Sequence, residues 1–256
     1  MTNKNFKYLL ILAIFSNFIV AEDKTKPEEE NKAKEKQETF IEEMVEDYEE
    51  IPGFFTTYRD PETNQIYLKI NEKQLEKEFI YFAHSLNSVV STGKVKGSYI
   101  DKGIFKIEKD YNNLRFIRVL TNFIFDENNP LQRSEGANTS DSTFAVLPIR
   151  GKTEEKDSFL IEITGLLISE SLTPIVPVIS REDFPPSGFA WGQVNPTKSR
   201  IVEVYNYEQN SDFEVEYVIE SAPSYEYSGE DAADPRYVSV NVRYSFIEMP
   251  DNNFEP

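Results

Sequence analysis

The sequence predicts a mainly β protein of the α+β class, with antiparallel sheets in a sandwich-like arrangement and a few short helices. Three observations predict this fold class. Apolar and polar residues alternate in several segments, which is the period of a half-buried strand. Clusters of Gly, Pro, Asn and Asp separate many of these segments by only a few residues. The chain of 256 residues is 39% hydrophobic and contains 19 Phe and 14 Tyr, which suffices for a core.

The first 21 residues have the pattern of a secretory signal peptide. Lys4 and Lys7 precede an apolar run that ends at Ala21 and is too short to span a bilayer comfortably. We therefore expect cleavage after Ala21 and a periplasmic or secreted protein; a buried N-terminal helix is the alternative. Residues 22–37 are rich in Glu and Lys, so they cannot bury enough apolar surface to offset the entropy cost of ordering. They are predicted to be a flexible leader.

Residues 38–87 are expected to form a helix-and-hairpin module. Apolar residues recur every three or four positions among glutamates, which predicts a helix over 40–51 that ends at Pro52-Gly53. The apolar stripe of this helix consists of Phe40, Ile41, Met44, Val45, Tyr48 and Ile51. Because its polar face is acidic, we expect the helix to pack on the protein's own sheet rather than on a membrane.

Three further elements complete this module. Two apolar segments flank the turn signal at residues 60–64, which predicts a hairpin. Asn71 is a favourable N-cap for a helical turn in "NEKQLEKE". The more continuous apolar run "FIYFAHSL" predicts an interior strand.

Residues 88–250 are expected to form a β-rich domain. The segment "GIFKIEKDYNNLRFIRVL" predicts a hairpin that turns at residues 110–113. Residues 126–143 are polar and predict a loop with a short helix, whereas "SFLIEITGLLI" predicts a strand. A long, proline-punctuated connection follows in "SLTPIVPVISREDFPPSGFAWGQVNP".

Two segments near the C-terminus show the strongest strand periodicity. In the second arm of the hairpin "RIVEVYNYEQNSDFEVEYVI", every other residue from Phe213 to Ile219 is apolar. Glutamates occupy the opposite face, and a one-residue slip would bury them, so the register is fixed. The same alternation from Val238 to Phe246 predicts a strand that is integral to the domain. Residues 251–256 lack periodicity and are predicted to be a mobile, linker-like tail.

The composition disfavours several classes of partner and chemistry. The net charge of −18 argues against nucleic acid and anionic membrane surfaces as partners. Because the chain has no cysteine, disulfides, thiolate chemistry and a lipoprotein anchor are excluded. We therefore expect no membrane anchor after signal cleavage.

The chain has one histidine, His84, on which every histidine-based general base, catalytic triad or zinc site would depend. It lies in an apolar strand without a nucleophile or metal motif, so a packed or edge-of-core histidine is our interpretation. The motif HExxH requires two histidines, which this chain does not have. We assign no catalytic, cofactor-binding or metal-binding residue.

Three alternatives stay open. An enzyme that uses carboxylates alone is possible in principle, although the glutamates fall on a predicted solvent face. The acidic loops at 126–130 and 228–235 could hold calcium through oxygen ligands, but they lack the spaced pattern of a calcium loop. Trp191, beside Phe189 and Pro185-Pro186, is either a ligand-facing aromatic platform or part of a loop clamped onto the core.

An ordered series of segments resembles a known family. The series is "IPGFFTTYRDPETNQIYLKINEKQLEKEFIYFAHSLNS", "DKGIFKIEKDYNNLRFIRV", "NPTKSRIVEVYNYEQNSDFEVEYVI" and "DPRYVSVNVRYSFIEMPDNNFEP". It is similar to the N-terminal region of the large exported bacterial zinc metalloproteases of the met-zincin type. The resemblance covers Glu38 to Pro256, and its specific features are the order of the segments and the closing one.

The resemblance implies a helix-and-hairpin module of unknown function, then a β-rich domain of unknown function, with a protease domain after them. In that family an extended HExxHxxGxxH helix holds the zinc, and no position of this chain matches it. The chain is thus expected to be non-catalytic, as a truncated product or a stand-alone version, and to shield, position or help fold a protease domain in cis or in trans. The rival interpretation is an independent extracytoplasmic binding module for a peptide or a glycan.

Overall fold

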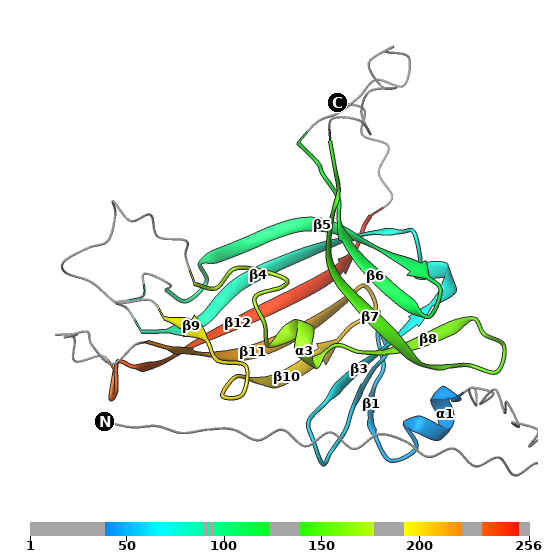
Figure 1. Ribbon diagram of the computed structural model, residues 1–256, viewed down its shortest axis with the longest axis horizontal. Helices are drawn as coiled ribbons and strands as arrows, with labels where there is room; N and C mark the ends of the chain where they lie inside the picture. Colours follow the sequence, from blue (N-terminus) through cyan, green and yellow to red (C-terminus); the bar gives the residue numbers. More distant parts are fainter. Residues whose placement is uncertain are drawn as a thin grey trace, which may run out of the picture. The chain divides into compact units, whose positions relative to one another are not determined.

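In the described part of the chain, twelve strands form one large sheet, which confirms the mainly antiparallel β class (Figure 1). The structure is a computed structural model that describes residues 39–89, 92, 95–122, 139–176, 192–221 and 232–250. The predicted signal peptide, the leader, Trp191 and the tail lie outside these residues. No helix in the described part of the chain is long and apolar enough to cross a membrane.

The strand order along the sheet is β1-β2-β3-β8-β7-β6-β5-β4-β12-β11-β10, and β9 pairs with β11 beside it. The strands are β1 (Glu49–Ile51), β2 (Thr57–Arg59), β3 (Ile66–Asn71), β4 (Glu78–Ser88), β5 (Tyr99–Asp110), β6 (Asn113–Arg118), β7 (Ser142–Lys152), β8 (Ser158–Glu162), β9 (Gln193–Val194), β10 (Arg200–Asn206), β11 (Asn210–Glu220) and β12 (Tyr237–Glu248). The described helices are the short α1 (Ile41–Met44), η1 (Glu72–Gln74) and α3 (Thr164–Leu167).

The central strands have the alternation that the sequence predicts. On β12 the five apolar side chains from Val238 to Phe246 are at most 2% exposed, and on β11 the four from Phe213 to Ile219 are fully buried. These side chains line the inner face of the sheet, and all except Val238 belong to the main core. Burying each one stabilises the fold by about 1.5–3 kcal/mol relative to leaving it in water. The β10–β11 and β5–β6 hairpins are confirmed as well.

The predicted elements between Asp60 and Ser88 are confirmed. The turn at 60–64 joins β2 to β3, and the Asp60 carboxylate accepts hydrogen bonds from the backbone of Glu62 and Thr63. Asn71 caps η1 through a reciprocal capping box with Gln74. β4 lies between β5 and β12 and is therefore an interior strand.

The helix predicted over 40–51 is wrong in its extent. The helix α1 covers only Ile41–Met44, and the last three residues of the predicted helix form β1. So short a helix, without a side-chain hydrogen bond at its N-cap, has little stability of its own, and residues 49–51 pair with β2 instead of continuing it. The apolar stripe nevertheless packs on the sheet. Ile41 is buried in a second cluster with Tyr58, Tyr67 and Leu160, while Met44, Val45 and Tyr48 are half-buried against it.

Two predictions about residues 126–168 also need correction. The segment "SFLIEITGLLI" is a strand only as far as Glu162, whose carboxylate accepts a hydrogen bond from Thr164 N at 2.6 Å as the chain turns into α3. Ser142 and Thr143, predicted as the end of a loop, begin the long strand β7, which sequence analysis did not predict. Residues 123–138 of this region lie outside the description.

The two ends of the sheet approach each other without forming a ladder. Asn206 of β10 donates hydrogen bonds from its amide to the carbonyls of Ile51 and Phe55, at 2.6 and 2.9 Å. Gly53 makes this approach possible, because a Cβ there would lie 2.4 Å from the Cβ of Asn206. The boundary predicted at 87/88 falls inside β4, and strands from both sides of it join one sheet within the compact unit Glu38–Pro256.

Candidate functional site

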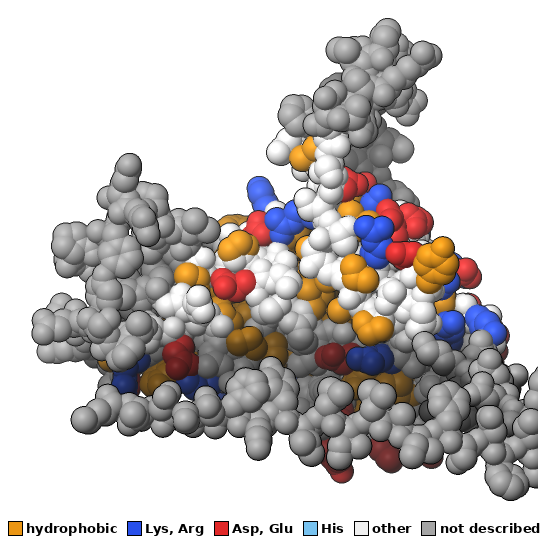
Figure 2. Space-filling view, viewed as in Figure 1, with side chains coloured by type: hydrophobic (Ala, Val, Ile, Leu, Met, Phe, Trp, Pro, Cys, Tyr) orange, Lys and Arg blue, Asp and Glu red, His pale blue; other side chains and the backbone are white. Residues whose placement is uncertain are grey.

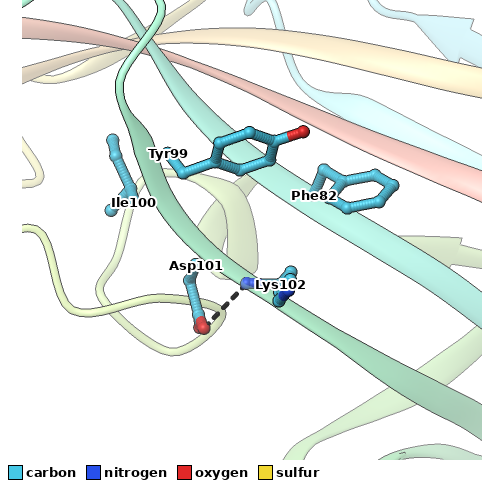
Figure 3. A pocket seen from close by; sticks show the side chains of 5 residues that line it. All are labelled: Phe82, Tyr99, Ile100, Asp101 and Lys102. Atoms are coloured by element: carbon cyan, nitrogen blue, oxygen red, sulfur yellow. Dashed lines mark hydrogen bonds between the residues drawn. The ribbon is translucent and has the colours of Figure 1, made fainter.

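The outer face of the central sheet carries a hollow of about 570 Å³ (Figure 3). Its lining residues are Phe82 of β4 and Tyr99, Ile100, Asp101 and Lys102 at the start of β5. Tyr99 is 75% exposed, and its ring centroid lies 6.0 Å from that of Phe82 in an edge-to-face arrangement. The hollow therefore presents an accessible aromatic ring next to a lysine, within the volume range typical of ligand pockets.

An irregularity in strand pairing places these side chains together. Phe82 pairs with Lys102 and His84 pairs with Tyr99, whereas Ala83 pairs with Asp101. Ile100 is thus an extra residue on β5, and such a bulge changes the direction in which the neighbouring side chains point. Without it, Tyr99 would point to the core side of the strand, because successive side chains alternate.

The floor of the hollow is fixed from the core side. The Asp101 carboxylate accepts hydrogen bonds from the Tyr81 hydroxyl at 2.7 Å, from Arg118 Nη2 at 3.0 Å and from the Thr173 hydroxyl at 3.3 Å. Arg118 also donates to the carbonyl of Leu172, and burial lowers the pKa of its guanidinium. The Asp101 carboxylate therefore has its hydrogen-bond partners within the protein, and these bonds hold β5 in place.

A second polar pair lies deeper in the same layer. The hydroxyls of Tyr217 and Tyr244 are 2.8 Å apart, and that of Tyr217 donates to the carbonyl of Leu167 in α3. Burial raises the pKa of both tyrosines well above the usual value, so both remain protonated donors. Together with Arg118 and Thr173, they bind the segment 163–176 to the inner face of the sheet.

His84 lies on the outer face, between Tyr99 on β5 and Arg243 on β12. Its side chain is half-exposed, and burial together with the charge of Arg243 lowers its pKa. Arg243 in turn forms an ion pair with Glu214 and lies 5.5 Å from the ring centroid of Tyr205. Within the described part of the chain, no group of His, Asp or Glu residues has the arrangement of a metal site.

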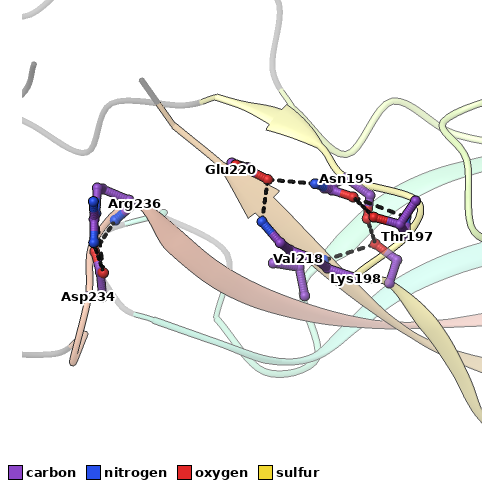
Figure 4. Close-up of polar contacts among 8 residues, drawn as sticks. Asn195, Thr197, Lys198, Val218, Glu220, Asp234 and Arg236 are labelled. Carbon is purple, nitrogen blue, oxygen red and sulfur yellow. Dashed lines mark hydrogen bonds and ion pairs between the residues drawn. The ribbon is translucent and has the colours of Figure 1, made fainter. Parts of the chain in front are cut away.

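The charged side chains near the far end of β11 pair with one another (Figure 4). Glu220 accepts hydrogen bonds from Lys198 at 2.6 Å and from Asn195 at 2.5 Å, which lower its pKa. Arg236 pairs with Asp234 and holds the pKa of that carboxyl at about 2. Asp234 belongs to one of the acidic loops considered for calcium, and its partner here is an arginine rather than a set of oxygen ligands. The other acidic residues considered for calcium lie outside the described positions.

A second hollow of about 590 Å³ lies beside α1 and η1. Its lining is mainly polar and includes Glu42, Glu50, Glu155, Asp157 and Lys69. Hydrogen bonds from Thr153 and Ser158 lower the pKa of Asp157, so this carboxylate already has partners within the protein. In Figure 2 acidic, basic and apolar side chains are interspersed over the visible face. We interpret this second hollow as a hydrated depression of the surface.

Sequence analysis missed the hollow beside Tyr99. The segment "GSYIDKGI" places an aromatic residue in a polar context, but its distance from Phe82 depends on the register of β4 and β5. The aromatic platform considered at Trp191 lies outside the described residues. The structure thus offers a different aromatic surface from the one that the sequence suggested.

The fold and the hollow define an antiparallel β protein with a ligand-sized depression on one sheet face. A family model described as a domain of unknown function, DUF5117, matches residues 97–256, and the chain belongs to this family. The match includes Tyr99 and Lys102 of the hollow, while Phe82 precedes it. No curated protein and no solved structure matches the chain.

Proposed function

We propose that the chain is the exported, non-catalytic N-terminal region of a zinc-dependent metalloprotease, and that it shields, positions or helps to fold a protease domain. The match to a domain of unknown function is compatible with the β-rich domain that the resemblance implies after residue 88. The assignment to metalloproteases depends on the order of the segments between Glu38 and Pro256.

The position of β12 is the observation that carries this proposal. This strand contains most of the closing segment of the resemblance, and it pairs with β4 on one side and β11 on the other. A domain joined after Pro250 would therefore be attached to the centre of the sheet rather than to a frayed edge. Attachment to a rigid element gives more precise positioning than attachment to a loop.

The direct test is binding to a separately produced met-zincin catalytic domain from the same organism, if one is encoded. We expect association at micromolar concentrations with residues 22–256, and a mature N-terminus at Glu22 in protein recovered outside the cytoplasm. An unrelated exported β protein of similar charge serves as the control. The absence of binding at micromolar concentrations would contradict the proposal, and an intact Met1 would contradict export.

A second candidate function is an extracytoplasmic binding module, and the hollow beside Tyr99 favours it. An exposed aromatic ring on a strand fixed from below is a preorganised contact surface. Genome context separates the two functions: an adjacent reading frame encoding HExxH supports the protease region, and an isolated gene supports the binding module. The DNA directly after the codon for Pro256 answers this question.

A further inference from the structure

We propose that the hollow beside Tyr99 binds the carboxyl-terminal residue of a peptide, with its apolar or aromatic side chain on Tyr99 and Phe82 and its carboxylate on Lys102. This inference depends on the second candidate function, a binding module, and it specifies the site and the class of ligand.

The aromatic half of the hollow fits an apolar side chain. Tyr99 is 75% exposed, while edge contact with the half-buried Phe82 holds its ring on the outer face. A ring that is already held in place loses little conformational entropy when it is covered, so its burial favours binding. The volume of about 570 Å³ accommodates one side chain and its terminal backbone.

The charged half of the hollow fits an anion. Lys102 lies opposite Phe82 in the pairing of β4 and β5, and its ammonium has no ion-pair partner among the described residues. Asp101 is the only acid among the described lining residues, but its carboxylate accepts bonds from Tyr81 and Arg118 on the core side. The accessible charge is therefore the positive charge of Lys102.

The aromatic half and the charged half of the hollow together favour one class of anionic ligand over others. The net charge of −18 repels polyanions at long range, so the attraction of Lys102 acts only over a short distance. A peptide terminus carries its carboxylate and its last side chain on the same carbon atom, and so it can reach the lysine and the ring together. An Asp or Glu side chain supplies the carboxylate without an apolar group.

The site is preorganised. Three side chains hold the Asp101 carboxylate, and the Asp101 side chain also accepts a hydrogen bond from Lys102 N at 2.8 Å. Gly103 lets the Tyr81 ring pack directly against β5, because a Cβ there would lie 2.8 Å from Tyr81 Cε1. Binding therefore requires no rearrangement of the strand that carries Tyr99 and Lys102.

The test uses acetyl-Ala-Ala-Phe with a free carboxylate and the same peptide as a carboxamide, titrated calorimetrically into residues 22–256. We expect the acid to bind about twofold to fivefold more tightly than the amide, as for a partly exposed charged contact. The difference should disappear in Lys102→Gln and persist in the control Lys73→Gln, which removes an exposed lysine of η1. Tyr99→Ala should weaken both peptides by about tenfold or more. Tyr111→Ala, at the opposite end of β5 and 91% exposed, should weaken neither.

The possible outcomes distinguish a failure of the proposed ligand class from a failure of the binding-module function. Equal binding of acid and amide that still needs Tyr99 would overturn the carboxylate assignment and leave the binding module standing. Retention of the acid preference in Lys102→Gln, with an unchanged denaturant midpoint, would also overturn it. Failure of both peptides to bind the unmodified protein would overturn this inference, while a ligand of another class that needs Tyr99 would keep the binding module.

Discussion

The two faces of β12 differ in almost every respect. Its inner face, from Val238 to Phe246, is almost fully buried, and the Tyr244 hydroxyl is its one polar side-chain group. Its outer face carries Ser239, Asn241 and Arg243, which are partly or fully exposed. Because side chains alternate along a strand, the same backbone serves both faces. The comparison shows that alternate residues along the central strands have different roles. One set is buried and stabilises the fold, and the other set determines the chemistry of the surface.

The inner face accounts for the dependence of the fold on β12. Each of its five apolar residues contributes about 1.5–3 kcal/mol, and their sum is comparable with the whole stability of a typical domain. We expect a chain that ends before Tyr237 to be unfolded, because β4 and β11 would lose their common neighbour. Circular dichroism and denaturant unfolding measure this effect, with removal of 251–256 alone as the control that should change little. A folded chain without 237–256 would show that the inner face of β12 is dispensable.

The adjacent residues Phe246 and Ile247 allow a direct comparison of the inner and outer faces of β12. The ring of Phe246 is 1% exposed and lies 5.2 Å from the ring centroid of Phe105 and 5.4 Å from that of Phe213. Phe246→Ala should lower the free energy of unfolding by about 3–5 kcal/mol, since it leaves a cavity. Ile247→Ala, on the outer face, should cost about 1 kcal/mol. Equal shifts of the urea midpoint in the two variants would mean that the inner and outer faces of β12 contribute equally to stability.

The alternation of buried and exposed residues also explains how much of the fold the sequence predicts. Strands with strict alternation, such as β11 and β12, were predicted together with the side chains that each buries. Strand β7 was missed because Pro148 interrupts it and because it pairs first with β6 and then with β8, so neither face has a uniform environment. The hollow could not be predicted, since Phe82 and Lys102 meet only through strand pairing and Tyr99 joins them only through the bulge at Ile100.

The stripe around α1 is an intermediate case, in which apolar residues on the outer side of the sheet form a small cluster of their own. Met44 is half-buried against the cluster of Ile41, Tyr58, Tyr67 and Leu160. Full burial would make Met44→Ala cost about 2–5 kcal/mol, so a half-buried side chain should cost about 1–2 kcal/mol. Denaturant unfolding measures the loss, and Glu43→Ala, on the exposed side of the same turn, is the matched control. An unchanged midpoint for Met44→Ala would show that this cluster contributes nothing to stability.

The smallest expected effect comes from the only histidine, on the polar outer face. Burial and the charge of Arg243 lower the pKa of His84 below 6.5 in the folded state, whereas the nearby Asp212 and Glu214 act in the opposite direction. Because the unfolded chain binds this proton more readily, the contribution of His84 to stability is complete above pH 6.5. It is lost as the pH falls through the folded pKa.

The test of this effect compares the unmodified protein with His84→Gln, since the many carboxylates titrate in both. We expect the urea midpoint of the unmodified protein to fall more between pH 7.5 and pH 5 than that of His84→Gln. A steeper loss in His84→Gln would reverse the sign and would mean that the acidic neighbours, rather than burial and Arg243, control the protonation of His84.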